Sequence, residues 1–237
     1  MYKGKRILCV IPARIGSKGL KQKNIKKFHG KPLLHFAIQA STNAELVDKV
    51  ILSTDSEKIS DSCKEFDNLE IVFRPKELSD DLATSASVLD HVLKTEKSKK
   101  LAYDVIIIVQ VTNPLVISED ISNTVKLHID SQADTCYSVV RIENFTYNKY
   151  FRMDENADLK RYIIDENINK SRQSFPSSFI RNGSCYSFLT ANIHGDTFFE
   201  GRTVGYEVPI ERYVDIDNQL DFDIAHFLYN RLSKKRD

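Results

Sequence analysis

The segment from Arg14 to Asn24 (RIGSKGLKQKN) has the composition of a loop that binds phosphate groups. Its two glycines let the backbone turn tightly and offer N–H groups to phosphate oxygens. Arg14, Lys18 and Lys23 supply the positive charge that a polyphosphate requires. Neither the Walker pattern nor the dinucleotide-binding fingerprint is present, so we expect a polyphosphate site of a different kind.

The charge distribution also indicates an anionic ligand near the start of the chain. Residues 1–44 contain eight lysines and two arginines, and the first carboxylate is Glu45. The formal net charge of all 237 residues is only +1, so the remainder of the chain is acidic. Such segregation favours an anionic ligand at the basic end. The near-neutral total argues against a nucleic-acid scaffold or a membrane-surface protein.

Two carboxylates near the other end of the chain could hold a metal ion. Asp215 and Asp217 are two residues apart, and they point to the same side if this segment is extended. Two neighbouring carboxylates resist joint deprotonation unless a cation lies between them, so a Mg2+ bound to both and to a triphosphate is expected. The alternative is that Asp217 caps a helix that begins near Gln219.

Strands and helices alternate along the chain, which predicts a mostly parallel α/β sheet. The ligand of such a sheet lies at the carboxyl ends of its strands, where the loops after Ile11, Ser53 and Val109 fall. The expected strands are Ile7–Ile11, Lys49–Ser53, Glu70–Phe73, Tyr103–Val109, Ser184–Leu189 and Val204–Val208. The expected helices are Pro32–Ala40, Asp55–Phe66, Ser85–Thr95, Ser118–Ile129 and Gln219–Leu232, the last with Leu220, Ile224, Phe227 and Leu228 on one face.

We expect one domain over residues 1–237, with a β-rich arm inserted at about residues 143–182, where the pattern becomes polar and poorly periodic. The four cysteines show no metal-binding or redox spacing, which suggests reduced thiols. No apolar run reaches the roughly 20 residues of a membrane-spanning helix, and the first residues do not look like a signal peptide. These features predict a cytoplasmic protein without a membrane partner.

The loop resembles the opening motif IPARxGSKGLxxKN of the acylneuraminate cytidylyltransferases, also called CMP-sialic acid synthetases. Further matches follow in the same order over nearly the whole chain, which one shared loop would not explain. They are Arg74-Pro75, Ala83–Ser87, Gln110–Leu115, Arg172-Gln173, Asn182-Gly183 and Asp215–Asp217.

This resemblance implies a three-layer Rossmann-like nucleotidyltransferase fold, with the arm as a dimerisation element of a homodimer. It implies transfer of CMP from CTP to the anomeric hydroxyl of a nine-carbon 2-keto sugar acid, with release of pyrophosphate and with Mg2+ as cofactor. The implied nucleotide-binding residues are Arg14, Ser17, Lys18, Asn24, Arg74 and Ser85. The implied sugar-binding residues are Gln110, Lys149, Arg172 and Asn182. Arg14, Lys23, Asp215 and Asp217 would be catalytic, the two aspartates as metal ligands.

Simpler readings of several residues stay open. Ser85 could merely cap a helix, Gln110 could be a satisfied polar residue at a strand end, and Lys149 and Arg172 could be surface charges.

The acceptor also stays open, because two positions depart from the neuraminate pattern. Val116 and Ile180 replace arginines, which removes charge near the expected acceptor pocket. Legionaminate, pseudaminate and a 3-deoxy-octulosonate are alternative acceptors for the same chemistry. An alternative of another class is a nucleotide-binding module without catalysis.

Overall fold

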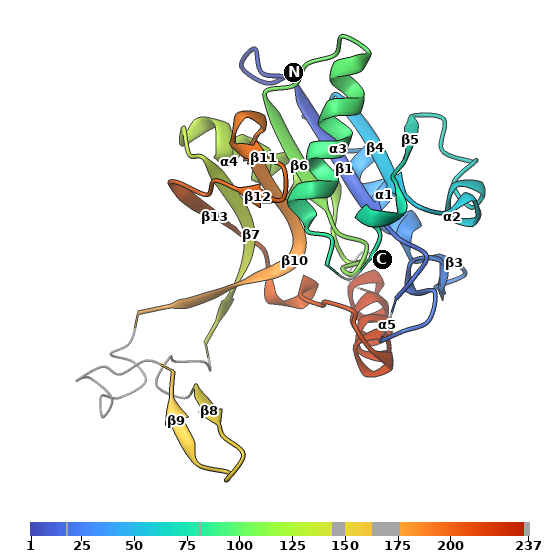
Figure 1. Ribbon diagram of the computed structural model, residues 1–237. Coiled ribbons are helices and arrows are strands. Elements are labelled where there is room, and N and C mark those ends of the chain that lie inside the picture. The colour runs from blue at the N-terminus through green and yellow to red at the C-terminus, as the bar shows by residue number, and fades with distance from the viewer. Residues whose placement is uncertain (18, 81, 144–149, 163–175, 235–237) are drawn as a thin grey trace.

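A seven-stranded sheet forms the centre of the molecule (Figure 1). The computed structural model describes residues 1–17, 19–80, 82–143, 150–162 and 176–234. The strand order is β13-β7-β10-β6-β1-β4-β5, and β10 runs antiparallel to both of its neighbours. The other neighbouring pairs are parallel. The strands are β1 (Ile7–Ala13), β4 (Lys49–Thr54), β5 (Leu69–Phe73), β6 (Val105–Val109), β7 (Thr135–Ile142), β10 (Ser178–Leu189) and β13 (Thr203–Glu207).

The continuous apolar runs of the central strands arise because both faces of the sheet are covered. Alternate side chains of β1 and β6 enter two separate cores, since successive residues of a strand point to opposite faces. Helices α1 (Leu34–Thr42) and α4 (Ser118–Asp130) pack on one face, and α3 (Ser85–Ser98) covers the other (Figure 1). The expected three-layer α/β architecture is therefore confirmed.

Several boundaries differ from the expectation. Helix α2 is only Glu57–Asp61 and ends five residues before the expected Phe66. Asp55 lies before this helix and accepts a hydrogen bond from the N–H of Ile15 at 3.0 Å. The strand β7 was not expected at all, although it pairs with both β10 and β13. Residues 213–217 form no strand, so Asp215 and Asp217 lie on irregular backbone.

The predicted apolar face of the last helix is wrong for Leu220, Ile224 and Phe227, and of the four predicted residues only Leu228 packs against the core. Helix α5 (Gln219–Ser233) buries Phe222 and Ala225, whereas Leu220 and Phe227 are 67% and 63% exposed. Phe222 packs edge-on against the buried ring of Phe28, with 5.7 Å between ring centroids. The helix has two apolar stripes, and this aromatic contact decides which one turns inward.

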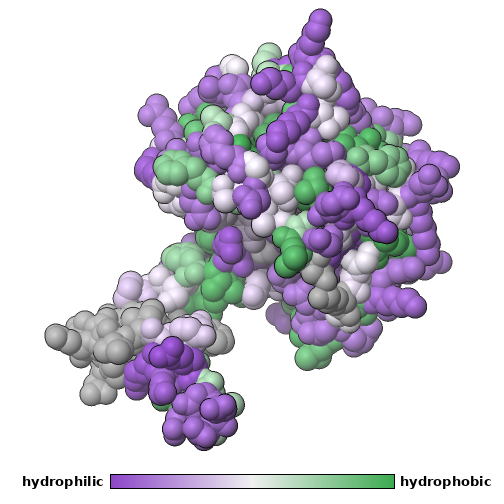
Figure 2. Space-filling view, viewed as in Figure 1, coloured by the Kyte–Doolittle hydropathy of each residue, from purple (hydrophilic) through white to green (hydrophobic). Residues whose placement is uncertain are grey.

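The described part of the expected arm contains a hairpin of β8 (Phe151–Met153) and β9 (Leu159–Arg161), which stands away from the sheet (Figure 1). Apolar side chains gather where this projection meets the body (Figure 2). Two more short hairpins join β2 (Lys27–Phe28) to β3 (Lys31–Pro32) and β11 (Ile193–His194) to β12 (Thr197–Phe198). Among the described residues, no helix combines the length and the apolar character needed to cross a bilayer.

Candidate active site

A cavity of about 530 Å3 opens at the carboxyl ends of β1 and β6, the edge where a parallel sheet binds its ligand. Its volume lies within the usual range for small-molecule sites. Eight of the residues predicted from sequence line it together: Arg14, Ser17, Lys23, Asn24, Arg74, Ser85, Gln110 and Asp217. They come from five separate parts of the chain, so the fold and not local sequence brings them together.

The basic loop is held in shape by its own polar side chains. The Ser17 hydroxyl donates to the carbonyl of Leu20 and accepts a hydrogen bond from the N–H of Lys23 at 3.0 Å. The side-chain amide of Asn24, a buried residue, donates to the carbonyl of Arg14 at 2.8 Å. These contacts fix the two ends of the loop relative to each other, so its cations are presented from a defined backbone.

The basic loop also contacts the segment that carries the two aspartates. The ammonium group of Lys23 lies 3.0 Å from Oδ1 of Asp217 and donates to the carbonyl of Ile216. Gly19 lies even closer to this segment, since a Cβ atom at this position would overlap the carbonyl oxygen of Asp217. A side chain at residue 19 is therefore incompatible with this approach, which explains the second glycine of the loop.

The cap of α5 leaves Asp217 available to a ligand. Asn218, not Asp217, is the N-cap, and its side chain accepts the N–H of Asp221 at 3.1 Å. The Asp217 side chain is 78% exposed and pairs with Lys23. The helix-capping interpretation of Asp217 is therefore wrong.

Asp215 does not line the cavity itself but packs against Gly183, whose φ is +63°. A Cβ atom at Gly183 would lie 2.9 Å from Cγ of Asp215. The pKa of Asp215 is raised, mainly because the surrounding protein excludes water from its carboxylate, and the negative charge of Asp217 adds to this. The Thr112 hydroxyl and Lys23 oppose the increase. A carboxylate in this situation gains from a nearby cation.

Arg74 and Arg14 converge on one residue at the rim of the cavity. Arg74, which is 7% exposed, donates from Nε to the Ser79 hydroxyl at 3.1 Å, and Arg14 donates to the Ser79 carbonyl at 3.3 Å. Burial lowers the pKa of Arg74; Asp55 opposes this effect and Arg14 adds to it. Two neighbouring guanidinium groups at a cavity favour an anionic ligand.

The amino end of α3 also faces the cavity. Thr84 is its N-cap and accepts the N–H of Ser87 at 3.1 Å, so Ser85 is not needed as a cap. Sequence reasoning missed Thr84 as a lining residue, although a threonine three residues before Ser87 is a recognisable cap signal. The first turn of a helix attracts negative charge.

Gln110 follows the last residue of β6 and lines the cavity, while its backbone N–H donates to Ser184 at 2.9 Å. Asn182, by contrast, is fully buried and does not line the cavity. Its Oδ1 accepts hydrogen bonds from the Ser138 hydroxyl at 2.6 Å and from the N–H of Ser184 at 3.2 Å. This geometry favours a supporting position for Asn182 behind the bulge that contains Gly183. Lys18, Lys149 and Arg172 lie outside the described residues.

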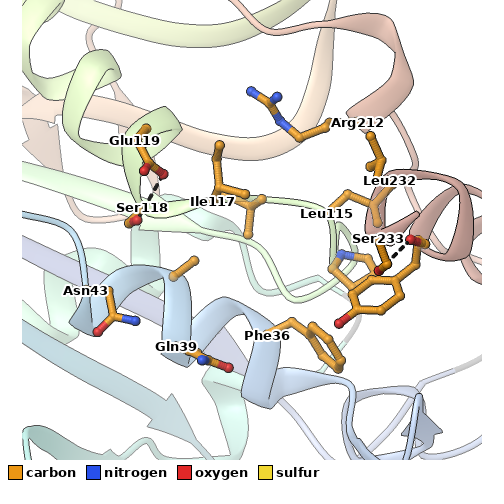
Figure 3. A pocket seen from close by; sticks show the side chains of 14 residues that line it. Phe36, Gln39, Asn43, Leu115, Ile117, Ser118, Glu119, Arg212, Leu232 and Ser233 are labelled. Carbon is orange, nitrogen blue, oxygen red and sulfur yellow. Dashed lines mark hydrogen bonds between the residues drawn. The ribbon is translucent and has the colours of Figure 1, made fainter. Parts of the chain in front are cut away.

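A second cavity, of about 550 Å3, lies beside α1 and the carboxyl-terminal part of α5 (Figure 3). Val116 lines it, together with Leu115, Ile117 and Arg212. No residue is shared between the linings of the two cavities. Val116 is therefore not in the cavity that contains Gln110, which corrects the expectation that its charge loss alters that pocket. Ile180, also expected near the acceptor, is half-buried in β10 opposite Val140.

The donor set at the first cavity suits Mg2+. Among the described residues there is no cluster of three or more metal-binding side chains. Mg2+ commonly binds through one or two carboxylates, with phosphate oxygens and water as the remaining ligands. Asp215 and Asp217 would provide the carboxylates, next to the loop that would hold the phosphates.

Proteins of known function resemble this chain over most of its length. The pseudaminic acid cytidylyltransferase of Campylobacter jejuni is 29% identical over 94% of this chain and 95% of its own length. The N-acylneuraminate cytidylyltransferase of Escherichia coli is 29% identical over 98% of this chain, which spans only 54% of that protein. A solved structure of a CMP-2-keto-3-deoxy-manno-octonic acid synthetase with CTP has a TM-score of 0.67 at 14% identity, over 96% of this chain and 99% of that one.

The likeness to the solved structure supports the fold alone, because the two sequences are so different. A family model described as cytidylyltransferase matches residues 8–230, which is nearly the whole chain. The resemblance expected from the motifs is thus confirmed. The chain belongs to the cytidylyltransferase family and is a CTP-dependent nucleotidyltransferase.

Proposed function

We propose that this protein transfers CMP from CTP to the anomeric hydroxyl of a nine-carbon 2-keto sugar acid and releases pyrophosphate. The observation that carries the proposal is the cavity at the sheet edge, where the basic loop, Arg74, Gln110 and Asp217 meet. Its family and its relatives give independent support.

In the proposed reaction, the anomeric oxygen of the sugar acid attacks the α-phosphorus of CTP. The bond from this phosphorus to the β-phosphate oxygen breaks, and pyrophosphate leaves. Arg14, Lys18, Lys23 and the N–H groups of the loop would hold the triphosphate. Catalysis would come mainly from positioning and charge stabilisation, as is usual for transfer at phosphorus.

Ser17, Asn24, Arg74 and Ser85 would complete the nucleotide site. Ser17 and Asn24 would act largely through the loop, since their described contacts are to its backbone.

Asp215 and Asp217 would hold Mg2+, which would neutralise charge on the phosphates. Lys23 now pairs with Asp217, so nucleotide and metal binding would require this ammonium group to turn toward the phosphates. Asp217→Asn tests the assignment, because it keeps the side-chain shape and removes the charge. We expect the rate of pyrophosphate release to fall at least about tenfold, equivalent to about 1.4 kcal/mol. An unchanged rate at saturating Mg2+ would refute the metal assignment.

The sugar acid would contact Gln110, which extends into the cavity from the end of β6. Arg172 and Lys149 remain proposed ligands of the sugar carboxylate and the α-phosphate, since a guanidinium group suits either anion. Asn182 would support this side of the site from behind the bulge.

A specific observation favours pseudaminate as a second candidate acceptor beside the sialic acids. The Campylobacter jejuni relative, whose name contains this sugar, is 29% identical over 94% of this chain and 95% of its own length.

The test is to measure pyrophosphate release and the CMP-sugar product with CTP, Mg2+ and a panel of sugar acids. The panel contains N-acetylneuraminate, legionaminate, pseudaminate and 3-deoxy-manno-octulosonate. We expect turnover with a nine-carbon acid and little with the eight-carbon octulosonate. CTP binding without turnover on any acceptor would favour the non-catalytic module instead.

We also propose that residues 143–182 form a dimerisation arm of a homodimer. Six large apolar side chains of its described part are exposed: Tyr150, Phe151, Met153, Leu159, Tyr162 and Phe179. Exposed apolar side chains that lie close together often mark protein interfaces. Sedimentation at micromolar concentration should show a dimer, and a monomer would refute the proposal.

A cytoplasmic location is proposed from the state of the cysteines. All four are buried and unpaired, as expected in a reducing compartment. Recovery of the native protein in a periplasmic or secreted fraction would contradict this location.

A further inference from the structure

Asn113 is a buried residue of the matched segment Gln110–Leu115, and no role was predicted for it. It lies between β6 and α4 and is 1% exposed. Its Oδ1 accepts the N–H of Leu115 at 3.0 Å, and its Nδ2 donates to two carbonyl oxygens, those of Asn182 and Arg212, at 3.2 Å each. Both ends of the amide are therefore engaged, and no other side-chain type of this size supplies one acceptor and two donors.

The two carbonyl partners belong to the pieces of chain that surround Asp215. Asn182 immediately precedes Gly183, whose Cα faces the Asp215 carboxylate. Arg212 lies three residues before Asp215. On the other side, the N–H of Ile216 donates to the carbonyl of Thr112 at 2.9 Å. Residues 112 and 113 thus hold the aspartate segment both before and after Asp215.

Arg212 is held in place by an ion pair with Asp120. Its Nε and Nη2 bind the two oxygens of Asp120, at 3.1 and 2.5 Å, and this carboxylate is 1% exposed. Figure 3 shows the Arg212 side chain beside the segment that carries Leu115 and Ile117. A bidentate pair with a buried carboxylate restricts the backbone of Arg212, so its carbonyl gives Asn113 a rigid partner.

We propose that Asn113 is a positioning residue that sets the Asp215 carboxylate in place for the metal ion. The inference depends on the proposed metal-binding role of Asp215. Asn113 does not itself line the nucleotide cavity, and the loop, Arg74 and Ser85 are held by other contacts. Loss of its amide should therefore disturb the metal and leave CTP affinity nearly intact.

The experiment compares Asn113→Ser with Thr190→Val. The Thr190 hydroxyl also donates to two backbone carbonyls, those of Tyr103 and Asp104, at the opposite end of the sheet. Both variants lose a donor to two carbonyl oxygens, but only Asn113 lies beside the aspartates. The matched control thus separates a general loss of stability from a local effect.

Binding of Mn2+ in the presence of CTP, without acceptor, is followed by electron paramagnetic resonance. We expect Asn113→Ser to raise the Mn2+ dissociation constant about fivefold or more, the net effect of one or two hydrogen bonds. CTP affinity without metal should change less than about twofold, and Thr190→Val should leave the Mn2+ constant unchanged. Equal Mn2+ affinity in Asn113→Ser, Thr190→Val and the wild type would overturn the inference.

Two further variants keep the result interpretable. If Asn113→Ser does not fold, Arg212→Lys replaces it, because lysine loses the bidentate contact with Asp120. It should weaken Mn2+ binding in the same direction, and an unchanged constant would overturn the inference. Asp215→Asn tests the underlying metal site. If Asp215→Asn binds Mn2+ like the wild type, the proposed metal assignment fails, whereas a loss there with none in Asn113→Ser rejects only the role of Asn113.

Discussion

Gly183 has no room for a side chain, and its substitution by alanine probes Asp215 without changing any charge. Its φ of +63° is in the left-handed region, where a Cβ atom costs about 1–2 kcal/mol. The added Cβ would lie 2.9 Å from Cγ of Asp215 and 3.0 Å from its Oδ2. Gly183→Ala therefore strains the backbone at residue 183 and also displaces the Asp215 carboxylate.

The size of the displacement follows from ordinary contact distances. Two carbon atoms prefer a separation of about 3.5–4.0 Å, so Asp215 must retreat by roughly 0.6–1.1 Å. Misplacement of a catalytic group by about 1 Å can cost about a hundredfold in rate. We expect a loss of about ten- to a hundredfold in the rate of CMP-sugar formation, together with about 1–2 kcal/mol of stability.

Gly4→Ala is the matched control, since Gly4 has a φ of +75° but no heavy atom within 4 Å of the place that an added Cβ would occupy. It lies in the turn before β1, at the end of that strand opposite to the cavity (Figure 1). The midpoint temperature of thermal unfolding should fall by about 2–8 °C in both variants, but only Gly183→Ala should lose activity. If Gly183→Ala were as active as Gly4→Ala, the argument that Gly183 makes room for Asp215 would be wrong.

Two other perturbations test the loop and the distant end of the sheet. Gly19→Ala would force the loop away from the Asp217 carbonyl, so CTP affinity measured by calorimetry should fall at least about tenfold, and an unchanged affinity would contradict the close contact. Glu96→Gln should cost about 3 kcal/mol at pH 7, because the buried Glu96 carboxylate pairs with Lys49 and Lys99. Burial opposes ionisation of Glu96, but these lysines hold its pKa below the usual range. The stabilisation from ionised Glu96 is therefore present above the pKa of the unfolded chain. It is lost as the pH falls through the lower pKa of the folded protein. Urea titrations at pH 7 and at about pH 3 should show this difference shrink, and a constant difference would contradict the ion-pair explanation.

The nucleotide half of the site could be predicted from the sequence because its residues lie in short, ordered motifs. The loop from Arg14 to Asn24 combines glycines with cations directly after a buried strand, and no other part of the chain has that pattern. Gln110 directly follows a strand that was expected to end at the ligand-binding edge of the sheet, whereas Arg74 and Ser85 were named from the family resemblance.

Other features depend on tertiary contacts that local patterns do not contain. Helix α5 has two apolar stripes, and the choice between Phe222 and Phe227 rests on the Phe28 ring, which lies near the other end of the sequence. The hydrogen bonds of Asn113 join three segments that are distant in sequence. Strand β7 lies between the expected helix Ser118–Ile129 and the expected arm, and no strand was predicted there. Its pairing with β10 and β13 is visible only in the folded sheet.

A crystal structure with CTP and Mn2+, in which anomalous scattering locates the metal, would show directly whether the basic loop and the two aspartates form one site. We expect the triphosphate against Arg14, Lys23 and the glycine loop, with Mn2+ bound to Asp215, Asp217 and a phosphate oxygen. Lys23 should then have turned from Asp217 toward the phosphates. A triphosphate outside this cavity, or a metal that contacts neither aspartate, would contradict the central claim that the two ends of the chain form one site.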